Sequence, residues 1–382
     1  MKYYILLLFT ATLFSCSSTL KLSVENNLDF DRSEEMVELD VNRLAKKIST
    51  LKADETYIVS CENEVIPSQI TSDGKLIFQS HLGASQKKTY EIKIDKVLTY
   101  NPKVFGRVFN ERKEDFAWEN DKVGFRLYGN ELKAFDGPSN GLDLWYKRTD
   151  KLVLNEWYRK SVEERISYHV DHGEGCDPYG VGHSLGAGAM APYIDEKLIL
   201  NDNYLKATIL DNGPLRFSAR LDYPDLEING RLIAESRTVT LDAGSQFTKI
   251  IQYYKVPESM QVAAGIVKRQ TNDSVLWNVS DNFFLYKEPE TQENGQIFLA
   301  VIMPDGLTKV KVDTYEYFHP VAKKNLTFSH VIGVADYNTQ KPLTYYTGFG
   351  WTKSGFMTVE DFQNYTKKYY QAVKQPFIIK FK

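Results

Sequence analysis

Short segments that alternate apolar and polar residues recur through most of this chain, and this pattern limits the fold more than any other feature. They include residues 123–128, 215–223, 247–254 and 296–302. A period of two places the apolar side chains on one face of a β-strand, and few long helical patterns separate these segments. Aromatic residues, which are enriched in strands, make up 13% of the chain. We therefore predict an all-β chain dominated by a large antiparallel sandwich.

The alternating pattern divides the chain into two β-rich parts. Residues 16–100 contain a polar tether followed by a small N-terminal β-sandwich. Residues 101–115 are charged and less periodic, and we predict that they form a linker. The large sandwich is predicted over residues 116–382, and it ends with a helix at about residues 358–373 that Thr358 can cap.

The first residues are similar to a bacterial lipoprotein signal peptide. Lys2 precedes an uncharged run at residues 3–14, which is too short to span a bilayer as a helix. A leucine three residues before Cys16 and a serine directly before it resemble a lipobox. We predict that residues 1–15 are removed and that a lipid on Cys16 anchors the protein at the outer membrane or in the periplasm of a Gram-negative bacterium. The alternative is an ordinary signal peptide with a coincidental cysteine.

The charge balance and the remaining cysteines exclude two classes of protein. The chain has 47 Lys and Arg residues against 50 Asp and Glu residues, a net charge of −3. No global basic field exists to hold nucleic acid, so nucleic acid is excluded as a partner. Cys61 and Cys176 stand far apart and neither has CxxC spacing. A disulfide scaffold is therefore excluded, and we expect two buried free thiols.

A glycine-rich segment at residues 168–191 carries the densest group of chemically active side chains. Three of the six histidines lie in it. Its candidate side chains are His169, Asp171, His172, Glu174, Asp177, Tyr179 and His183. A polar, glycine-rich connection between strands is a common place for a functional site.

This segment supports three interpretations. The first is a metal site, for which His169, Asp171 and Glu174 are the candidate ligands. The second is general acid–base catalysis by histidine and tyrosine, and the third is a loop whose histidines only satisfy backbone groups. Ser184 also fits a G-x-S-x-G pattern, but a nucleophile elbow needs a strand–turn–helix setting that an all-β region does not provide.

Two strands near this segment supply further candidates. Alternation places Asp143, Trp145 and Lys147 on one strand face, and Arg216 and Arg220 on one face of another strand. An aromatic ring beside basic groups suits an anionic sugar, because arginine can bind a carboxylate through two hydrogen bonds. The alternative is a solvated outer face with salt bridges. His319 and His330 are expected to be structural histidines, although His330 is kept as a candidate substrate contact.

Several motifs resemble one family of lipoproteins from the polysaccharide-utilisation loci of Bacteroidetes. The motifs are residues 118–129, 141–148, 169–182, 212–217 and 346–355. The family was long classed as a domain of unknown function, and it includes the ulvan oligosaccharide dehydratase. The resemblance covers about residues 25–380. It implies that the large sandwich is a supersandwich similar to galactose-mutarotase-like folds.

The resemblance also implies a reaction. The enzyme would eliminate water from a non-reducing-end glucuronic or iduronic acid on sulfated rhamnose, giving a 4,5-unsaturated uronate. A base takes the C5 proton, an acid protonates the leaving 4-hydroxyl, and cationic groups or a divalent metal offset the carboxylate charge. We assign His172 as base and Tyr179 as acid, with exchangeable roles, and Arg216 and Lys147 to the carboxylate. Further substrate contacts are assigned to Asp143, Trp145, His169, Arg220 and His330. The scheme names no cofactor, and a divalent metal stays open.

Other functions fit the same sequence. A polysaccharide lyase would use similar residues and expel a sugar in place of water. A glycoside hydrolase needs two carboxylates, which Asp171, Glu174 and Asp177 can provide. A surface glycan-binding lipoprotein needs only aromatic platforms and no acid–base pair.

Overall fold

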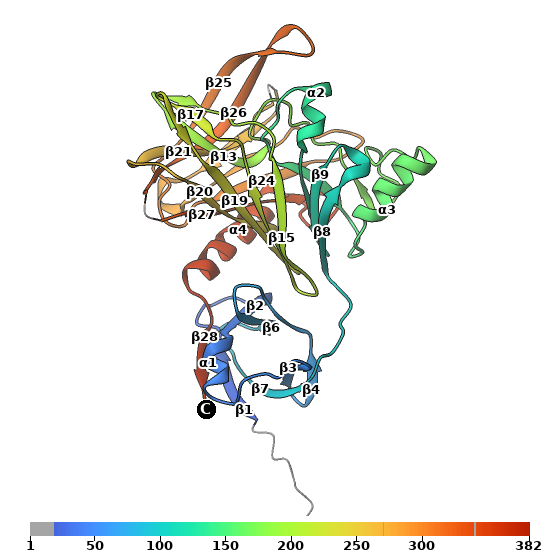
Figure 1. Cartoon of the computed structure of the whole chain (residues 1–382), viewed down its shortest axis with the longest axis vertical. Helices are drawn as coiled ribbons and strands as arrows, with labels where there is room; N and C mark the ends of the chain where they lie inside the picture. The colour runs from blue at the N-terminus through green and yellow to red at the C-terminus, as the bar shows by residue number, and fades with distance from the viewer. Residues whose placement is uncertain (1–18, 270, 340) are drawn as a thin grey trace, which may run out of the picture.

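The computed structural model describes residues 19–269, 271–339 and 341–382. Strands form most of its regular structure, in a small N-terminal unit and a larger unit, which lie at the bottom and top of Figure 1. The predicted all-β fold with a C-terminal helix is confirmed. Within the described ranges, no helix has both the length and the apolar character needed to cross a bilayer. Cys16 and the predicted signal peptide at residues 1–15 lie outside these ranges.

The N-terminal unit is a two-sheet sandwich with its own apolar core. One sheet has the order β28 (Ile378–Phe381), β1 (Leu20–Glu25), β7 (Lys87–Lys96), β3 (Glu55–Cys61), β4 (Glu64–Ile66), and the other β2 (Arg32–Asp40), β6 (Lys75–Leu82), β5 (Ser68–Ile70). A short helix, α1 (Val41–Ala45), follows β2. In β6, Leu76 and Phe78 enter the small core, whereas Ile77 points to the opposite face and joins the core of the larger unit. Because both faces of β6 are buried, its sequence is continuously apolar at this point.

Two predicted boundaries are corrected by the strand pairing. β28 pairs with β1, with Leu22 opposite Phe381, so the end of the chain belongs to the N-terminal sheet and not to the large sandwich predicted over residues 116–382. The segment 101–115, predicted to be a linker, contains β8 (Val104–Phe109), which pairs with the next strand. The strand itself contains one charged residue, Arg107, at a half-buried position, and the other charged residues that suggested a linker lie outside it.

The larger unit contains three main sheets. The first has the order β12 (Gly175–Cys176), β11 (Asp143–Lys147), β10 (Gly124–Leu127), β9 (Asp115–Asn120), β8. The second has the order β14 (Lys197–Leu198), β13 (Ala187–Ile194), β21 (Met260–Val267), β26 (Lys324–Tyr337), β25 (Lys309–His319). The third has the order β15 (Lys206–Asn212), β16 (Arg216–Asp222), β19 (Glu235–Asp242), β20 (Phe247–Tyr254), β27 (Leu343–Trp351), β24 (Ile297–Ile302), β23 (Phe283–Lys287), β22 (Ser274–Trp277). A separate hairpin joins β17 (Leu226–Ile228) to β18 (Arg231–Ile233).

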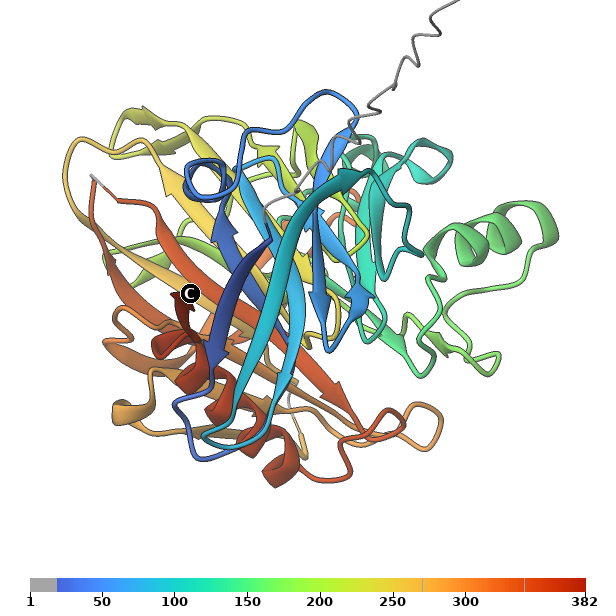
Figure 2. The same cartoon turned by 90° about the horizontal axis from the view of Figure 1, so that it is seen from below.

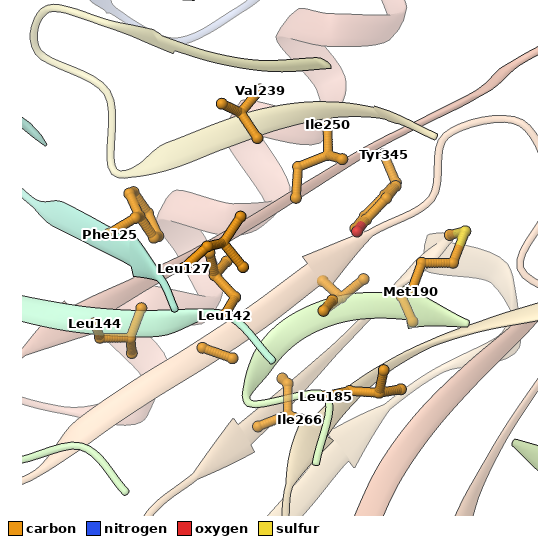
Figure 3. Packing of buried hydrophobic residues seen from close by; sticks show 14 of the residues in the cluster. Phe125, Leu127, Leu142, Leu144, Leu185, Met190, Val239, Ile250, Ile266 and Tyr345 are labelled. Atoms are coloured by element: carbon orange, nitrogen blue, oxygen red, sulfur yellow. The ribbon is translucent and has the colours of Figure 1, made fainter. Parts of the chain in front are cut away.

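The main apolar core lies between these sheets. Figure 3 shows residues from all three sheets meeting there, including Phe125 of β10, Met190 of β13 and Val239 of β19. Alternation along β10 turns Phe125 and Leu127 into this core and leaves Arg126 on the opposite face. That opposite face carries the polar groups described in the next section.

Helices cover two parts of the larger unit. α3 (Leu154–Arg159), continued by a π-helical turn (Lys160–Glu164), packs over the outer face of the first sheet, and α2 (Lys133–Asp136) is a single turn. α4 (Val359–Lys374) covers the third sheet, where Phe362 stacks on Phe247, and it leads the chain back to the N-terminal unit (Figure 1). In Figure 2, the C-terminal strand lies beside the N-terminal strands.

The predicted cap of the C-terminal helix is confirmed, and it provides a stability test. The Thr358 hydroxyl accepts a hydrogen bond from the Asp361 backbone N–H, and the Asp361 carboxylate accepts one from the Thr358 backbone N–H. We expect Thr358→Ala to lower the free energy of unfolding by about 1 kcal/mol, since one exposed N–H loses its partner. Urea unfolding measures this change. An unaltered midpoint would mean that the cap does not stabilise the chain.

Candidate functional site

The glycine-rich segment crosses the edge of the first sheet. Its residues Gly175 and Cys176 form β12, which pairs with Tyr146 and Lys147 of β11. Gly175 has a φ of +125°, and a Cβ atom there would lie 1.9 Å from the Tyr146 carbonyl oxygen. The close pairing of the segment with β11 therefore requires a glycine at this position.

Beneath this segment, the outer face of the first sheet holds a buried cluster of charges around Arg126. Asp143 lies opposite Arg126 in the register of β10 and β11, and its Oδ2 accepts a hydrogen bond from the Arg126 Nε at 2.9 Å. The Asp177 Oδ2 accepts one from an Arg126 Nη at 2.7 Å, and the Asp115 Oδ2 lies 3.7 Å from the other Nη. Only 4% of the Arg126 side chain is exposed. Three carboxyl groups thus share one guanidinium out of contact with solvent.

The excess of carboxyl groups changes their protonation. Burial raises the pKa of Asp115 to about 6, against the opposing effect of Arg126. Burial also holds the pKa of Asp177 well above its usual range, and Asp143 adds to this effect through its negative charge. The Asp177 Oδ1 has no hydrogen-bond partner among the described residues. The cluster therefore retains protons that exposed carboxyl groups would have lost.

The raised pKa of Asp115 predicts a pH-dependent effect of Asp115→Asn. The Asp115 carboxyl binds its proton more tightly in the native state than in the unfolded state. Its contribution to the free energy of unfolding is therefore fully present below about pH 3.8 and is lost as the pH rises through about 6. An asparagine stays neutral at every pH. We expect the stability of Asp115→Asn relative to the wild type to rise by about 2–3 kcal/mol between pH 4 and pH 7, measured by urea unfolding. A difference that does not change with pH would contradict this assignment.

His169 connects this cluster to solvent. Its Nδ1 lies 2.6 Å from the Asp177 carbonyl oxygen and 3.5 Å from the Asp177 Oδ2. Because a carbonyl oxygen only accepts hydrogen bonds, this contact places the proton of a neutral ring on Nδ1 and leaves a lone pair on Nε2. The side chain is 55% exposed, and Nε2 has no partner among the described residues. This geometry suits a general base.

Two tyrosines border the same site. The Tyr168 ring packs between Trp145 and His169, with ring centroids 4.9 and 4.5 Å away, and its hydroxyl accepts a hydrogen bond from the Arg112 Nε at 2.9 Å. The Tyr128 hydroxyl donates to the Asp143 Oδ2 at 2.7 Å. Burial beside Asp143 raises the pKa of Tyr128. Tyr128 therefore contacts the charged cluster directly through Asp143, and Tyr168 packs on His169 beside it.

His172, predicted to be the base, lies in the same loop as His169 but apart from the Arg126 cluster. Its Nε2 is 3.1 Å from the Ser167 carbonyl oxygen, and its side chain lines a cavity of about 180 Å³ with Trp157, Tyr168 and Glu174. His172 contacts no residue of the Arg126 cluster. The structure thus brings His169, and not His172, next to the buried carboxylates.

The predicted acid, Tyr179, is buried in the main core. Its hydroxyl donates to the Gly186 carbonyl oxygen at 3.1 Å, and Arg269 lies over its ring at 5.0 Å. Burial raises the pKa of Tyr179 well above its usual value. These contacts correct the prediction, because the Tyr179 proton is already engaged inside the protein.

Arg216 lies at the junction of the two units, away from the glycine-rich segment. Its Nε donates to the Asp242 Oδ1 at 2.6 Å and its Nη2 to Glu38 at 2.6 Å. The predicted role as a substrate carboxylate receptor is corrected, since protein carboxylates occupy the guanidinium. Arg220 is exposed and pairs with Asp222 at 2.9 Å.

Asp143, Trp145 and Lys147 do share one strand face, as predicted, but this face is not open to solvent. All three are buried. Trp145 stacks on Trp157 of α3, and the Lys147 Nζ donates to the Glu119 Oε2 at 2.6 Å. The predicted contacts of these side chains with substrate are corrected, because α3 and Tyr168 cover the face on which they lie.

The remaining histidine candidates are structural. His330 is fully buried, and its Nε2 accepts a hydrogen bond from the Leu185 backbone N–H at 2.8 Å. Burial lowers the pKa of His330 to about 3, so the predicted substrate contact is corrected. His183 stacks on Tyr317, and Ser184 is buried with its hydroxyl bonded to the Val181 carbonyl oxygen.

The predicted metal ligands are engaged with separate partners. Asp171 pairs with Arg148 at 3.1 Å, and Glu174 pairs with Lys151 at 2.9 Å, while His169 faces Asp177. In the part of the chain that the structure describes, no group of three or more His, Cys, Asp or Glu side chains is arranged to hold a metal ion. Of the two free cysteines, Cys176 is buried as expected and Cys61 is half-buried.

Sequence reasoning missed Arg126, Asp115 and Arg112, and it considered Asp177 only as a carboxylate for the hydrolase alternative. A signal for Arg126 was present, because a charged residue stands between Phe125 and Leu127 in a strand whose other positions are apolar. An arginine at such a position needs a buried partner. The sequence contains no comparable signal for Arg112.

Comparisons with known proteins place this chain in a family. The fold and site are those of a β-sandwich protein with a buried arginine–carboxylate cluster beneath a half-exposed histidine. Residues 24–379 match the family described as "Domain of unknown function (DUF4861)", and the chain belongs to this family. It is 26% identical over 400 residues to "Uncharacterized protein P7" of Formosa agariphila, covering 98% of both chains.

Two solved structures are similar to this chain at low sequence identity. A glycosyl hydrolase family 38 protein from Enterococcus faecalis matches with a TM-score of 0.50 and 9% identity over 95% of this chain and 47% of that chain. A heparinase III matches with a TM-score of 0.35 and 11% identity over 67% of this chain and 36% of that chain. The present chain therefore spans about half the length of the hydrolase structure.

Proposed function

We propose that the protein is a carbohydrate-active enzyme that dehydrates the non-reducing-end uronic acid of ulvan-type sulfated rhamnose oligosaccharides. The observation that carries the proposal is the orientation of His169, whose Nδ1 is held by Asp177 so that Nε2 can accept a proton from a substrate. Two further points support the choice of substrate class. The motifs at residues 118–129 and 169–182 resemble the ulvan dehydratase group, and the fold is shared with a glycosyl hydrolase.

The proposed reaction is a β-elimination that balances without a further reactant. The His169 Nε2 takes the C5 proton, which the adjacent carboxylate group acidifies. The C5–H electron pair forms the C4=C5 double bond, the C4–O bond breaks, and the 4-hydroxyl leaves as water after receiving a proton. The Tyr168 hydroxyl is our candidate for this acid, because its ring lies against His169. The Asp177 carbonyl oxygen, 2.6 Å from Nδ1, accepts the Nδ1 proton in a hydrogen bond and so stabilises the imidazolium that forms.

Ultraviolet absorbance combined with product mass tests this function. Incubation of the purified protein with saturated uronate-ended oligosaccharides should raise the absorbance of the conjugated alkene while each product loses one water and keeps its sugar units. A rise with chain cleavage would identify a lyase instead. Sugar release without a rise would identify a hydrolase, and binding without turnover would identify a glycan-binding protein.

We also propose that a lipid on Cys16 anchors the protein to a bacterial membrane, as the residues around it resemble a lipobox. Cys16→Ala should move the protein from the membrane fraction to the soluble fraction without changing its turnover. Cys61→Ala is the matched control and should stay in the membrane fraction. Retention of Cys16→Ala in detergent-free membranes would contradict the anchor.

A further inference from the structure

Arg112 is a half-buried arginine without an ion-pair partner beside the candidate site. It ends the 3₁₀ turn Asn110–Arg112 between β8 and β9, and its Nε donates to the Tyr168 hydroxyl at 2.9 Å. No carboxylate of the described residues pairs with it. Two other arginines of this region do have such partners, since Arg107 pairs with Glu111 and Arg148 pairs with Asp171.

The lack of a partner follows from the arrangement of charges around Arg112. The carboxyl groups of Asp115 and Asp177 lie in the neighbouring cluster, where Arg126 holds them. With Nε bonded to Tyr168, both Nη groups of Arg112 remain without a partner among the described residues. Two Nη groups of one guanidinium form a planar fork that matches the two oxygens of a carboxylate.

We propose that Arg112 binds the carboxylate of the substrate uronic acid; this inference rests on the proposed function. One aromatic ring, Tyr168, separates Arg112 from His169, because it contacts Arg112 through its hydroxyl and His169 through its ring. In a uronic acid, the carboxylate is attached directly to C5. A carboxylate held by Arg112 thus directs C5 toward His169, and the positive charge stabilises the negative charge that develops when C5 loses its proton.

Binding of small probes tests this assignment independently of turnover. The probes are methyl β-glucuronoside and its neutral amide, and their dissociation constants are measured by NMR titration of the full soluble chain. The wild type should prefer the charged probe by about 10-fold to 100-fold, as expected for a charge-assisted contact. Arg112→Gln should remove this preference. Arg112→Lys should retain part of it, because a lysine keeps the charge but not the fork.

A matched control variant and a third probe test whether the preference is specific to Arg112 and to a carboxylate. Arg165→Gln removes an exposed arginine of the same region that forms no ion pair among the described residues, and it should leave the preference unchanged. A sulfated methyl rhamnoside tests whether Arg112 binds sulfate instead. If Arg112→Gln raises the dissociation constant of the sulfated probe more than that of the glucuronoside, the carboxylate assignment is overturned.

The outcomes separate this inference from the proposed function. Equal binding of the charged and neutral probes by the wild type, or an unchanged preference in Arg112→Gln, would overturn the role of Arg112 even if the oligosaccharide is dehydrated. A preference that depends on Arg112 in a protein that produces no unsaturated uronate would support the role of Arg112 and refute the dehydratase. If Arg112→Gln does not fold, Arg112→Lys decides the outcome, since wild-type preference in that variant would contradict a forked contact.

Discussion

Replacement of His169 by alanine should lower kcat for dehydration by roughly 10²–10⁴-fold, the range expected for loss of a general base. The side chain is 55% exposed, and its protein contacts are a hydrogen bond to the Asp177 backbone and packing on Tyr168. The melting temperature should therefore change little. Steady-state kinetics, followed by the absorbance of the unsaturated product, gives the effect on kcat.

His172→Ala is the matched control for this experiment. His172 lies three residues away in the same loop and also bonds a backbone carbonyl through one ring nitrogen. It has no contact with the Arg126 cluster, so its loss should leave kcat close to the wild-type value. A large loss of activity in His172→Ala together with normal activity in His169→Ala would exchange their assignments.

Replacement of Arg126 by methionine should cost about 3–5 kcal/mol in the free energy of unfolding, because it leaves buried carboxyl groups without their cation. Arg126 is the only cation within salt-bridge distance of the Asp143 and Asp177 carboxyl groups, apart from His169, among the described residues. The remaining carboxyl groups would repel one another and would take up protons. Denaturant unfolding at neutral pH measures the loss, and lowering the pH should recover part of it.

Arg220→Met serves as the control for this prediction. Arg220 pairs with Asp222 in an exposed position, and such pairs contribute about 0–1 kcal/mol. Arg126→Met should therefore be several times more destabilising than Arg220→Met. Equal losses in the two variants would mean that the Arg126 cluster is not the stabilising element inferred from its burial.

Alternation predicted which side chains share a strand face but not what covers that face. Asp143, Trp145 and Lys147 lie together as expected, and yet they are buried. Their cover is α3 with Tyr168, which packs on Trp145 from segments later in the chain. Strand periodicity is a local property, whereas the packing of a later segment on a sheet is set by tertiary contacts. Periodicity alone therefore does not distinguish a solvent-facing polar face from a covered one.

The glycine-rich segment was identified correctly as an unusual loop, but the roles within it were not resolved. His169 and His172 stand three residues apart with similar neighbours. What separates them is the contact between Asp177 and Arg126, which joins the loop to a strand far back in the sequence. This contact turns Asp177 toward His169. Residue types and spacing do not contain that information, because it depends on how the loop folds over the sheet.

The pairing of β28 with β1 has a consequence for the order of events during synthesis. The ribosome completes the N-terminal strands early, but β28, which covers the outer edge of β1, leaves the exit tunnel only after all strands of the larger unit. Until then β1 presents unpaired backbone groups, which are a site for association with other chains. The N-terminal sheet is therefore completed only after the larger unit has been synthesised, and a chain interrupted before β28 retains an open sheet edge.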